Sequence, residues 1–147
     1  MDTPGQHGRI APFLLAGLLA CVSTSLPVFA QEKMGPLDGM VFVGETGEMS
    51  KTTGDPDELS FKAGMFHSKA CDPYGFGDGA YTANVSGETM TFEATTVSPT
   101  EGKMVWKFTV KGEELNGSFI WYRAPKWYRF FLSNEPVDYW VKAKLKK

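Results

Sequence analysis

The sequence predicts an all-β protein, an antiparallel meander of about eight strands that closes into a small barrel. Apolar and polar residues alternate with a period of two in one segment after another beyond residue 40. Short turns that contain glycine separate most of these segments. No stretch of the chain after its first thirty residues keeps an apolar period of 3.6 through three helical turns. Closure into a barrel removes unpaired strand edges, and a two-sheet β-sandwich is the alternative.

The first strand and the first hairpin lie between residues 39 and 69. The segment "GMVFVGE", which begins at Gly39, reads as the opening strand. In "ELSFKAGMFHSKA", Leu59 and Phe61 alternate with Ser60 and Lys62, and "AG" provides the turn before the next strand.

Two further hairpins follow, one around "SGE" and one around "KGEE". In each, every second residue is apolar, so that one face of both strands is expected to point inward. The inward residues of the hairpin around "SGE" are predicted to be Met90, Phe92 and Ala94. Those of the hairpin around "KGEE" are predicted to be Met104, Trp106, Phe108, Val110, Leu115, Phe119 and Trp121.

The last strand, "DYWVKAKLKK", has the same alternation, with an inward face predicted to hold Tyr139, Val141, Ala143 and Leu145. Two connections are longer than the turns. One is the polar segment "ETGEMSKTTGDPDE" after the first strand, and the other is the aromatic segment "APKWYRFFLSNEPV" before the last. Long loops on a small barrel are often lids or contact surfaces.

The first thirty residues have the pattern of a secretory signal peptide. Arg9 precedes an uncharged run whose most apolar part, Ile10 to Ala20, is shorter than the roughly 20 residues that a transmembrane helix needs. The tripeptide "VFA" is typical of a cleavage site after Ala30. This interpretation gives a signal peptide at 1–30, a polar leader at 31–36 and a single β-barrel domain at 37–147.

A second interpretation of the same segment uses "LLAC", which is similar to a bacterial lipobox. Cys21 would then be the lipidated first residue of an outer-membrane lipoprotein. The expected location is the bacterial periplasm for the first interpretation and a membrane surface for the second. In neither does the mature chain contain a transmembrane span.

Composition narrows the range of partners. The chain of 147 residues has a formal net charge of −2, which offers no basic surface for nucleic acid. Removal of the signal peptide leaves Cys71 as the one cysteine of the mature chain, so no internal disulfide can form. The fold must therefore rest on its apolar core, and no cofactor is expected.

The strand "LDGMVFVGE", the succession of hairpins and the segment "WKFTVKGEELNGSFIWY" together resemble the small lipocalin-like (calycin) barrels of bacterial secreted proteins. The resemblance covers most of residues 37–145. Lipocalins carry the motif G-x-W in their first strand, whereas here Gly39 is followed by Met40 and Val41. The resemblance implies the architecture of a lipocalin barrel.

The segment "FHSKACDPYGFG" joins one of the two histidines of the chain to Cys71. On one continuous strand, His67 and Cys71 would stand about 13 Å apart, too far to share a zinc ion or to act as base and nucleophile. Met65 and His67 share one strand face, and with Cys71 they form a weak candidate for copper(I). We expect a surface histidine, a structural cysteine and no catalytic residues.

The aromatic residues of the predicted interior indicate a non-enzymatic binding protein that holds a small apolar ligand at the mouth of the barrel. The alternatives are a protein-binding module, such as a periplasmic enzyme inhibitor, and the weak metal binder. An interior filled by its own side chains fits the same composition. The candidate ligand-binding residues are Phe92, Trp106, Phe108, Phe119, Trp121, Trp127, Tyr128, Phe131 and Tyr139.

Overall fold

The computed structural model describes residues 34–127 and 134–147. The predicted signal peptide and the candidate site residues Tyr128 and Phe131 lie outside the described residues, and the prediction that the mature chain begins at Gln31 does too.

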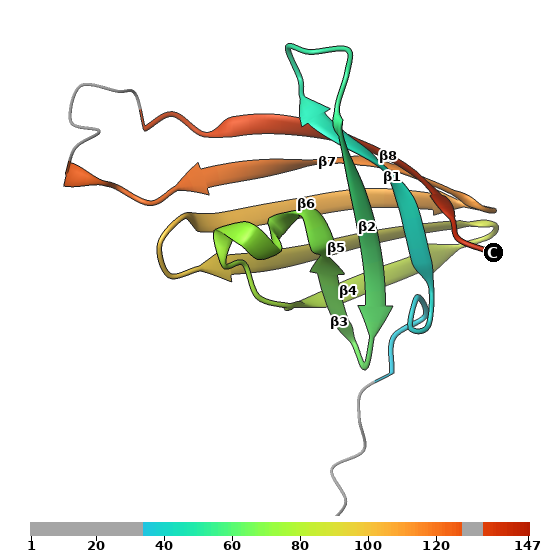
Figure 1. The fold of residues 1–147 in the computed structure, drawn as a ribbon. Coiled ribbons are helices and arrows are strands. Elements are labelled where there is room, and N and C mark those ends of the chain that lie inside the picture. Colours follow the sequence, from blue (N-terminus) through green and yellow to red (C-terminus); the bar gives the residue numbers. More distant parts are fainter. Residues whose placement is uncertain (1–33, 128–133) are drawn as a thin grey trace, which may run out of the picture. The chain divides into compact units, whose positions relative to one another are not determined.

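Eight strands and one short 3-10 helix make up the described chain (Figure 1). The strands pair in sequence order, each antiparallel to the next, and β8 pairs with β1, so that the barrel is closed. This confirms the predicted meander and rules out the sandwich. The elements are β1 (Val41–Glu48), β2 (Asp55–Lys62), β3 (Met65–Ser68), η1 (Lys69–Tyr74), β4 (Gly79–Ser86), β5 (Thr89–Ser98), β6 (Gly102–Lys111), β7 (Glu114–Arg123) and β8 (Val137–Leu145).

Two glycines, Gly64 and Gly44, occupy positions where the backbone conformation or the space disfavours a larger residue. Ala63 and Gly64 form the two-residue turn between β2 and β3 with φ of 52° and 74°, the left-handed pair that such hairpins need. Gly44 stands opposite Ala143 where β1 closes on β8. A Cβ atom at position 44 would lie 2.0 Å from the carbonyl oxygen of Lys142, so a larger residue would push the closing strands apart.

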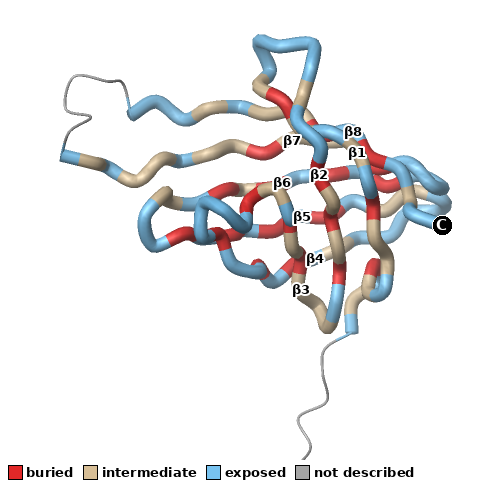
Figure 2. The backbone as a smooth tube through the Cα atoms, viewed as in Figure 1, coloured by how far each residue is buried: buried red, intermediate tan, exposed pale blue. Residues whose placement is uncertain are grey.

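The predicted inward face is confirmed along β5 and β6. Figure 2 shows buried and exposed residues alternating along these strands. Aromatic rings fill the interior, and Trp106, which is 0% exposed, donates its indole N–H to Thr96 Oγ1 at 2.9 Å. The buried rings around it belong to Phe42, Phe61, Phe66, Tyr81, Phe92, Phe108 and Phe119. This part of the barrel is packed solid by its own side chains.

The end of the barrel where the chain enters is closed by the residues just before β1. Leu37 is completely buried, and its amide donates to the Tyr81 hydroxyl at 3.1 Å. The Asp38 carboxylate accepts hydrogen bonds from the amides of Gly35 and Gly64 at 2.8 and 2.9 Å and from the Tyr81 hydroxyl at 2.9 Å. Leu37 and this carboxylate network thus close the end of the barrel at which the described chain enters.

Two sequence-based expectations are wrong in detail. The long polar connection after the first strand is mostly strand, because β1 continues to Glu48 and β2 begins at Asp55. The inward positions of these strand ends open into a hollow, so polar residues there are not penalised as core residues would be. Cys71 does not continue β3 either, since the chain turns at Lys69 into η1.

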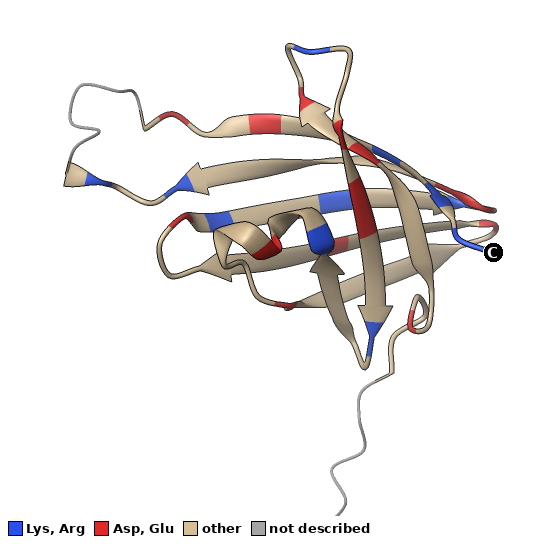
Figure 3. Cartoon of the chain, in the orientation of Figure 1, with Lys and Arg blue, Asp and Glu red and all other residues tan. Residues whose placement is uncertain are grey.

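Charges of both signs are interspersed over the strands and turns, as Figure 3 shows. The lysines that end the chain pair with acids of neighbouring elements, Lys146 with Glu58 at 2.9 Å and Lys147 with Glu113 at 3.3 Å. The lysines of the basic C-terminus are therefore solvent-exposed partners of surface ion pairs, on a strand that is paired on both sides. Within residues 34–127 and 134–147, no helix is long and apolar enough to cross a membrane.

Candidate ligand site at the barrel mouth

The two ends of the barrel differ. Tight turns and the residues just before β1, Leu37 among them, close one end, which we call the base. At the other end, which we call the mouth, lie the β1–β2 loop, η1, the β5–β6 turn, the end of β7 and the start of β8 (Figure 1). A hollow of about 540 Å³ opens there. The residues that line it are Thr46, Gly47, Glu48, Lys51, Thr53, Gly54, Asp55, Ala70, Cys71, Tyr74, Met104, Phe119, Trp121 and Tyr139.

One wall of the hollow is aromatic and comes from β7 and β8. The rings of Phe119 and Tyr139 stack with centroids 4.6 Å apart, and Phe119 also contacts the core ring of Trp106 at 4.1 Å. Trp121 is fixed by a 2.9 Å hydrogen bond from its indole N–H to the carbonyl of Glu101. Burial raises the pKa of the Tyr139 hydroxyl. This wall is a rigid apolar surface.

The adjoining wall is polar and comes from β1, β2 and the loop that joins them, and the two walls meet where Glu48 on β1 is paired with Tyr139 on β8. Glu48 forms an ion pair with Lys51 at 3.1 Å, and Asp55 stands at the start of β2. Beneath them Asp57, which is buried, accepts hydrogen bonds from the Ser68 hydroxyl at 2.7 Å and from the Ala70 amide at 2.9 Å. Burial raises the pKa of the Asp57 carboxyl, and these hydrogen bonds oppose the rise.

The sulfur-containing residues Cys71 and Met104 form part of the inner end of the hollow, which we call its floor. The Cys71 thiol donates to the thioether of Met104 at 3.8 Å and lies 3.2 Å from the Ser68 hydroxyl. Burial raises the pKa of Cys71 to about 11. At neutral pH the residue is therefore a protonated, weakly nucleophilic thiol, as expected for a structural cysteine.

The structure separates Cys71 from the other two predicted metal candidates, Met65 and His67, which lie two residues apart on β3. His67 is on the outer face of β3, where Nδ1 is 2.8 Å from Asp78 and Nε2 is 3.2 Å from Asp72. Cys71 faces the hollow on the other side of the sheet. No group of three or more His, Cys, Asp or Glu side chains that could hold a metal ion occurs among the described residues.

The structure describes seven of the nine predicted ligand-binding residues and divides these seven into three groups. Phe119, Trp121 and Tyr139 line the hollow. Phe92, Trp106 and Phe108 are part of the packed core, so a ligand in the hollow would reach them only through other side chains. Trp127 is 88% exposed at the start of the β7–β8 connection.

Sequence reasoning missed the polar wall. Thr46, Glu48 and Asp55 occupy inward positions of β1 and β2, in register with the buried Phe42 and Leu59. Because side chains alternate between the two faces of a strand, every second residue from Phe42 or Leu59 points inward, and this rule places Thr46, Glu48 and Asp55 inside the barrel. Because these residues are polar, the hydropathy pattern alone predicts a loop there.

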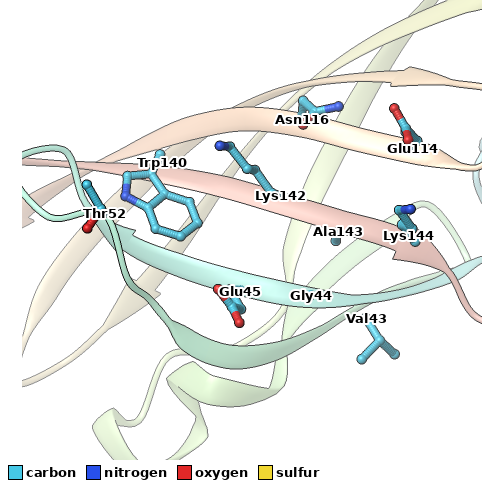
Figure 4. Close-up of a pocket in the computed structure, with 10 residues that line it drawn as sticks. All are labelled: Val43, Gly44, Glu45, Thr52, Glu114, Asn116, Trp140, Lys142, Ala143 and Lys144. Carbon is cyan, nitrogen blue, oxygen red and sulfur yellow. The ribbon is translucent and has the colours of Figure 1, made fainter.

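A second depression, of about 510 Å³, lies on the outer surface of the barrel over β1, β7 and β8 (Figure 4). Figure 4 shows Glu45, Asn116 and Lys142 standing on these strands. The indole N–H of Trp140 donates to the Lys51 carbonyl at 2.9 Å. The Lys142 ammonium lies 5.5 Å from the centre of the Trp140 ring. These are alternating polar residues of a solvated sheet face, and we place the candidate site at the mouth.

Comparisons with models of known protein families, with curated proteins and with solved structures find no match to this chain. The likeness to lipocalins is therefore one of architecture, an eight-stranded antiparallel closed barrel.

Proposed function

We propose that the chain is an exported, non-enzymatic binding protein of the small lipocalin-like type, which holds a small apolar ligand at the barrel mouth. The observation that carries the proposal is the contrast between a packed interior and a hollow lined by Phe119, Trp121 and Tyr139. Its volume of about 540 Å³ is within the range of roughly 300–1,000 Å³ that is usual for sites that bind small molecules.

The packing limits the size of the ligand. Below the aromatic wall, Trp106 and the phenylalanines that surround it leave no path toward the base. A long chain that runs down the barrel axis does not fit, whereas a ligand of one or two rings does. Export agrees with the predicted signal peptide, and the protonated Cys71 and the outward His67 supply no nucleophile and base pair.

The test is titration with N-phenyl-1-naphthylamine, a neutral probe that becomes fluorescent in apolar surroundings. We expect saturable binding by the wild-type protein and a loss of roughly tenfold in affinity for Trp121→Ala, since buried aromatic anchors carry much of the energy of a binding site. Tyr122→Ala is the matched control, because Tyr122 is the next residue on β7 but lies outside, beside Lys103. Equal affinity of Trp121→Ala and wild type would contradict the proposal.

A protein-binding module, such as an inhibitor of a periplasmic enzyme, is the second candidate. The observation in its favour is Trp127, a large ring that is 88% exposed beside the mouth, because exposed aromatic residues are enriched at binding surfaces. If this function holds, Trp127→Ala will weaken binding to the partner protein and leave the affinity for the naphthylamine probe unchanged.

A further inference from the structure

The hollow at the mouth is not uniformly apolar, and its charges are unbalanced. The charged residues that line it are Glu48, Lys51 and Asp55. Lys51 and Glu48 neutralise each other through their ion pair at 3.1 Å. In the part of the chain that the structure describes, Asp55 makes no ion pair. One negative charge therefore remains at the edge of the hollow.

Asp57 adds a second carboxylate to the same side. It stands two residues after Asp55 on β2 and therefore points to the same face of the strand. Its hydrogen-bond partners are the Ser68 hydroxyl and the Ala70 amide, no lysine or arginine among the described residues forms an ion pair with it, and the nearby His67 acts to lower its pKa. Asp57 does not itself line the hollow, so it favours a cation there only through its charge.

We propose that the ligand of this site is an organic cation, a molecule of one or two apolar rings that carries a protonated amine. This inference rests on the proposed function. The amine lies toward Asp55 and Asp57, and the rings lie against Phe119, Trp121 and Tyr139. Electron-rich aromatic faces attract ammonium groups as well as apolar ones, so that both walls of the hollow favour the same ligand.

One cation near the mouth acts in the opposite sense. The Arg123 guanidinium lies 4.9 Å from the Trp121 ring, and its Nε atom is buried with no hydrogen-bond partner. Arg123 is not among the residues that line the hollow, but its charge reaches the aromatic wall, because it is one of the groups that lower the pKa of the Tyr139 hydroxyl against the effect of burial. A preference for anions would show that Arg123 outweighs the two aspartates.

The experiment compares three probes of matched bulk, 1-naphthylmethylamine, 1-naphthalenemethanol and 1-naphthoate, at pH 7 and low salt. These are respectively a cation, a neutral molecule and an anion. Isothermal titration should show the amine binding about threefold to tenfold more tightly than the alcohol, and the naphthoate binding most weakly. The advantage of the amine should shrink in 0.5 M salt, because the contribution of Asp55 is exposed to screening.

Two variants locate the effect. Asp55→Asn should reduce the ratio of amine affinity to alcohol affinity by roughly twofold to fivefold. Asp55 is exposed, so this variant should fold. Glu88→Gln is the matched control, because it removes one negative charge from the β4–β5 turn at the opposite end of the barrel. It should change none of the three affinities.

The outcomes separate the two proposals. If the amine and the alcohol bind equally well, or if the naphthoate binds most tightly, the cation proposal is overturned while the apolar site stands. If Asp55→Asn and Glu88→Gln weaken amine binding equally, the preference comes from net charge and the assignment to the mouth is overturned. If none of the three probes binds, the proposed function is wrong, and the cation proposal is wrong with it.

Discussion

The base and the mouth of this barrel are built from the same strands but use opposite chemistry. On β2, the inward residues change from Phe61 and Leu59 near the base to Asp57 and Asp55 at the mouth. On β5, they change in the same direction from Phe92 to Ser98. One strand can thus contribute core residues at one end and binding-site residues at the other. The residue type that suits an inward position depends on how deep in the barrel that position lies.

The largest effect that this comparison predicts is on the stability of two tryptophan variants. Trp106→Ala removes a fully buried ring from the packed part of the barrel and should lower the free energy of unfolding by about 3–5 kcal/mol. Trp121→Ala removes a half-buried ring from the edge of the hollow and should cost clearly less. Urea denaturation measures both values. Equal losses would mean that the mouth is packed like the core.

This contrast corrects an expectation from the sequence. The alternation alone places Trp106 and Trp121 on the same apolar face, which predicts similar losses for both. It does not tell how deep in the barrel a position lies. Depth depends on which strand ends meet at the mouth, and that follows from the closure of β8 on β1.

The two ends should also respond in opposite ways to pH. Although burial acts to raise the pKa of Asp38 at the base, hydrogen bonds from Gly35, Gly64 and Tyr81 lower it below the usual value. Asp57 at the mouth has its pKa raised by burial. Asp38 should therefore stabilise the fold above a pH of about 4 and lose that contribution as pH falls through its folded pKa.

For Asp57 the sign is reversed. The folded state binds its proton more tightly than the unfolded state, so ionisation of Asp57 makes the protein less stable as pH rises from about 4 through the folded pKa. Melting temperatures of wild type, Asp38→Asn and Asp57→Asn from pH 3 to pH 7 test both signs. Wild type should lose stability relative to Asp38→Asn on acidification and gain it relative to Asp57→Asn. The same direction for both differences would contradict this account.

The smallest predicted effect concerns Cys71. Cys71→Ser should cost roughly 1 kcal/mol in unfolding free energy, within the range that is typical of point mutants. Because the thiol is buried with a pKa raised to about 11, alkylation by iodoacetamide at pH 7 should be slow in the folded protein and fast in urea. Rapid alkylation of the folded protein, or a disulfide-linked dimer on non-reducing gels, would show that the floor of the hollow is open and reactive.

Much of the fold follows from the sequence, because apolar residues that recur with a period of two, separated by glycine-containing turns, are compatible with few folds. The hairpins, their faces and closure into a barrel were predicted in this way. The closure of the base was not, since Leu37 and Asp38 act through contacts with Tyr81 and Gly64, which are distant in the sequence. The place of Cys71 also escaped prediction, because η1 begins after only four residues of β3.

The candidate site was predicted in part. Its aromatic wall follows from alternation, which identifies Phe119, Trp121 and Tyr139 as inward residues. Its polar wall does not, because an inward Asp55 or Glu48 contradicts the usual rule for a barrel interior and is explained only by the hollow.

The central claim is that ligands bind at the mouth and nowhere else on the barrel. Backbone amide chemical shifts, recorded during titration of 1-naphthalenemethanol into the labelled protein, test it most directly. We expect chemical-shift changes that saturate at Thr46, Asp55, Met104, Trp121 and Tyr139. We expect no change at Leu37 at the base, nor at Glu45 and Lys142 in the depression on the outer surface over β1, β7 and β8. Saturating chemical-shift changes in the depression on the outer surface, or no saturating change at any residue of the mouth, would contradict the claim.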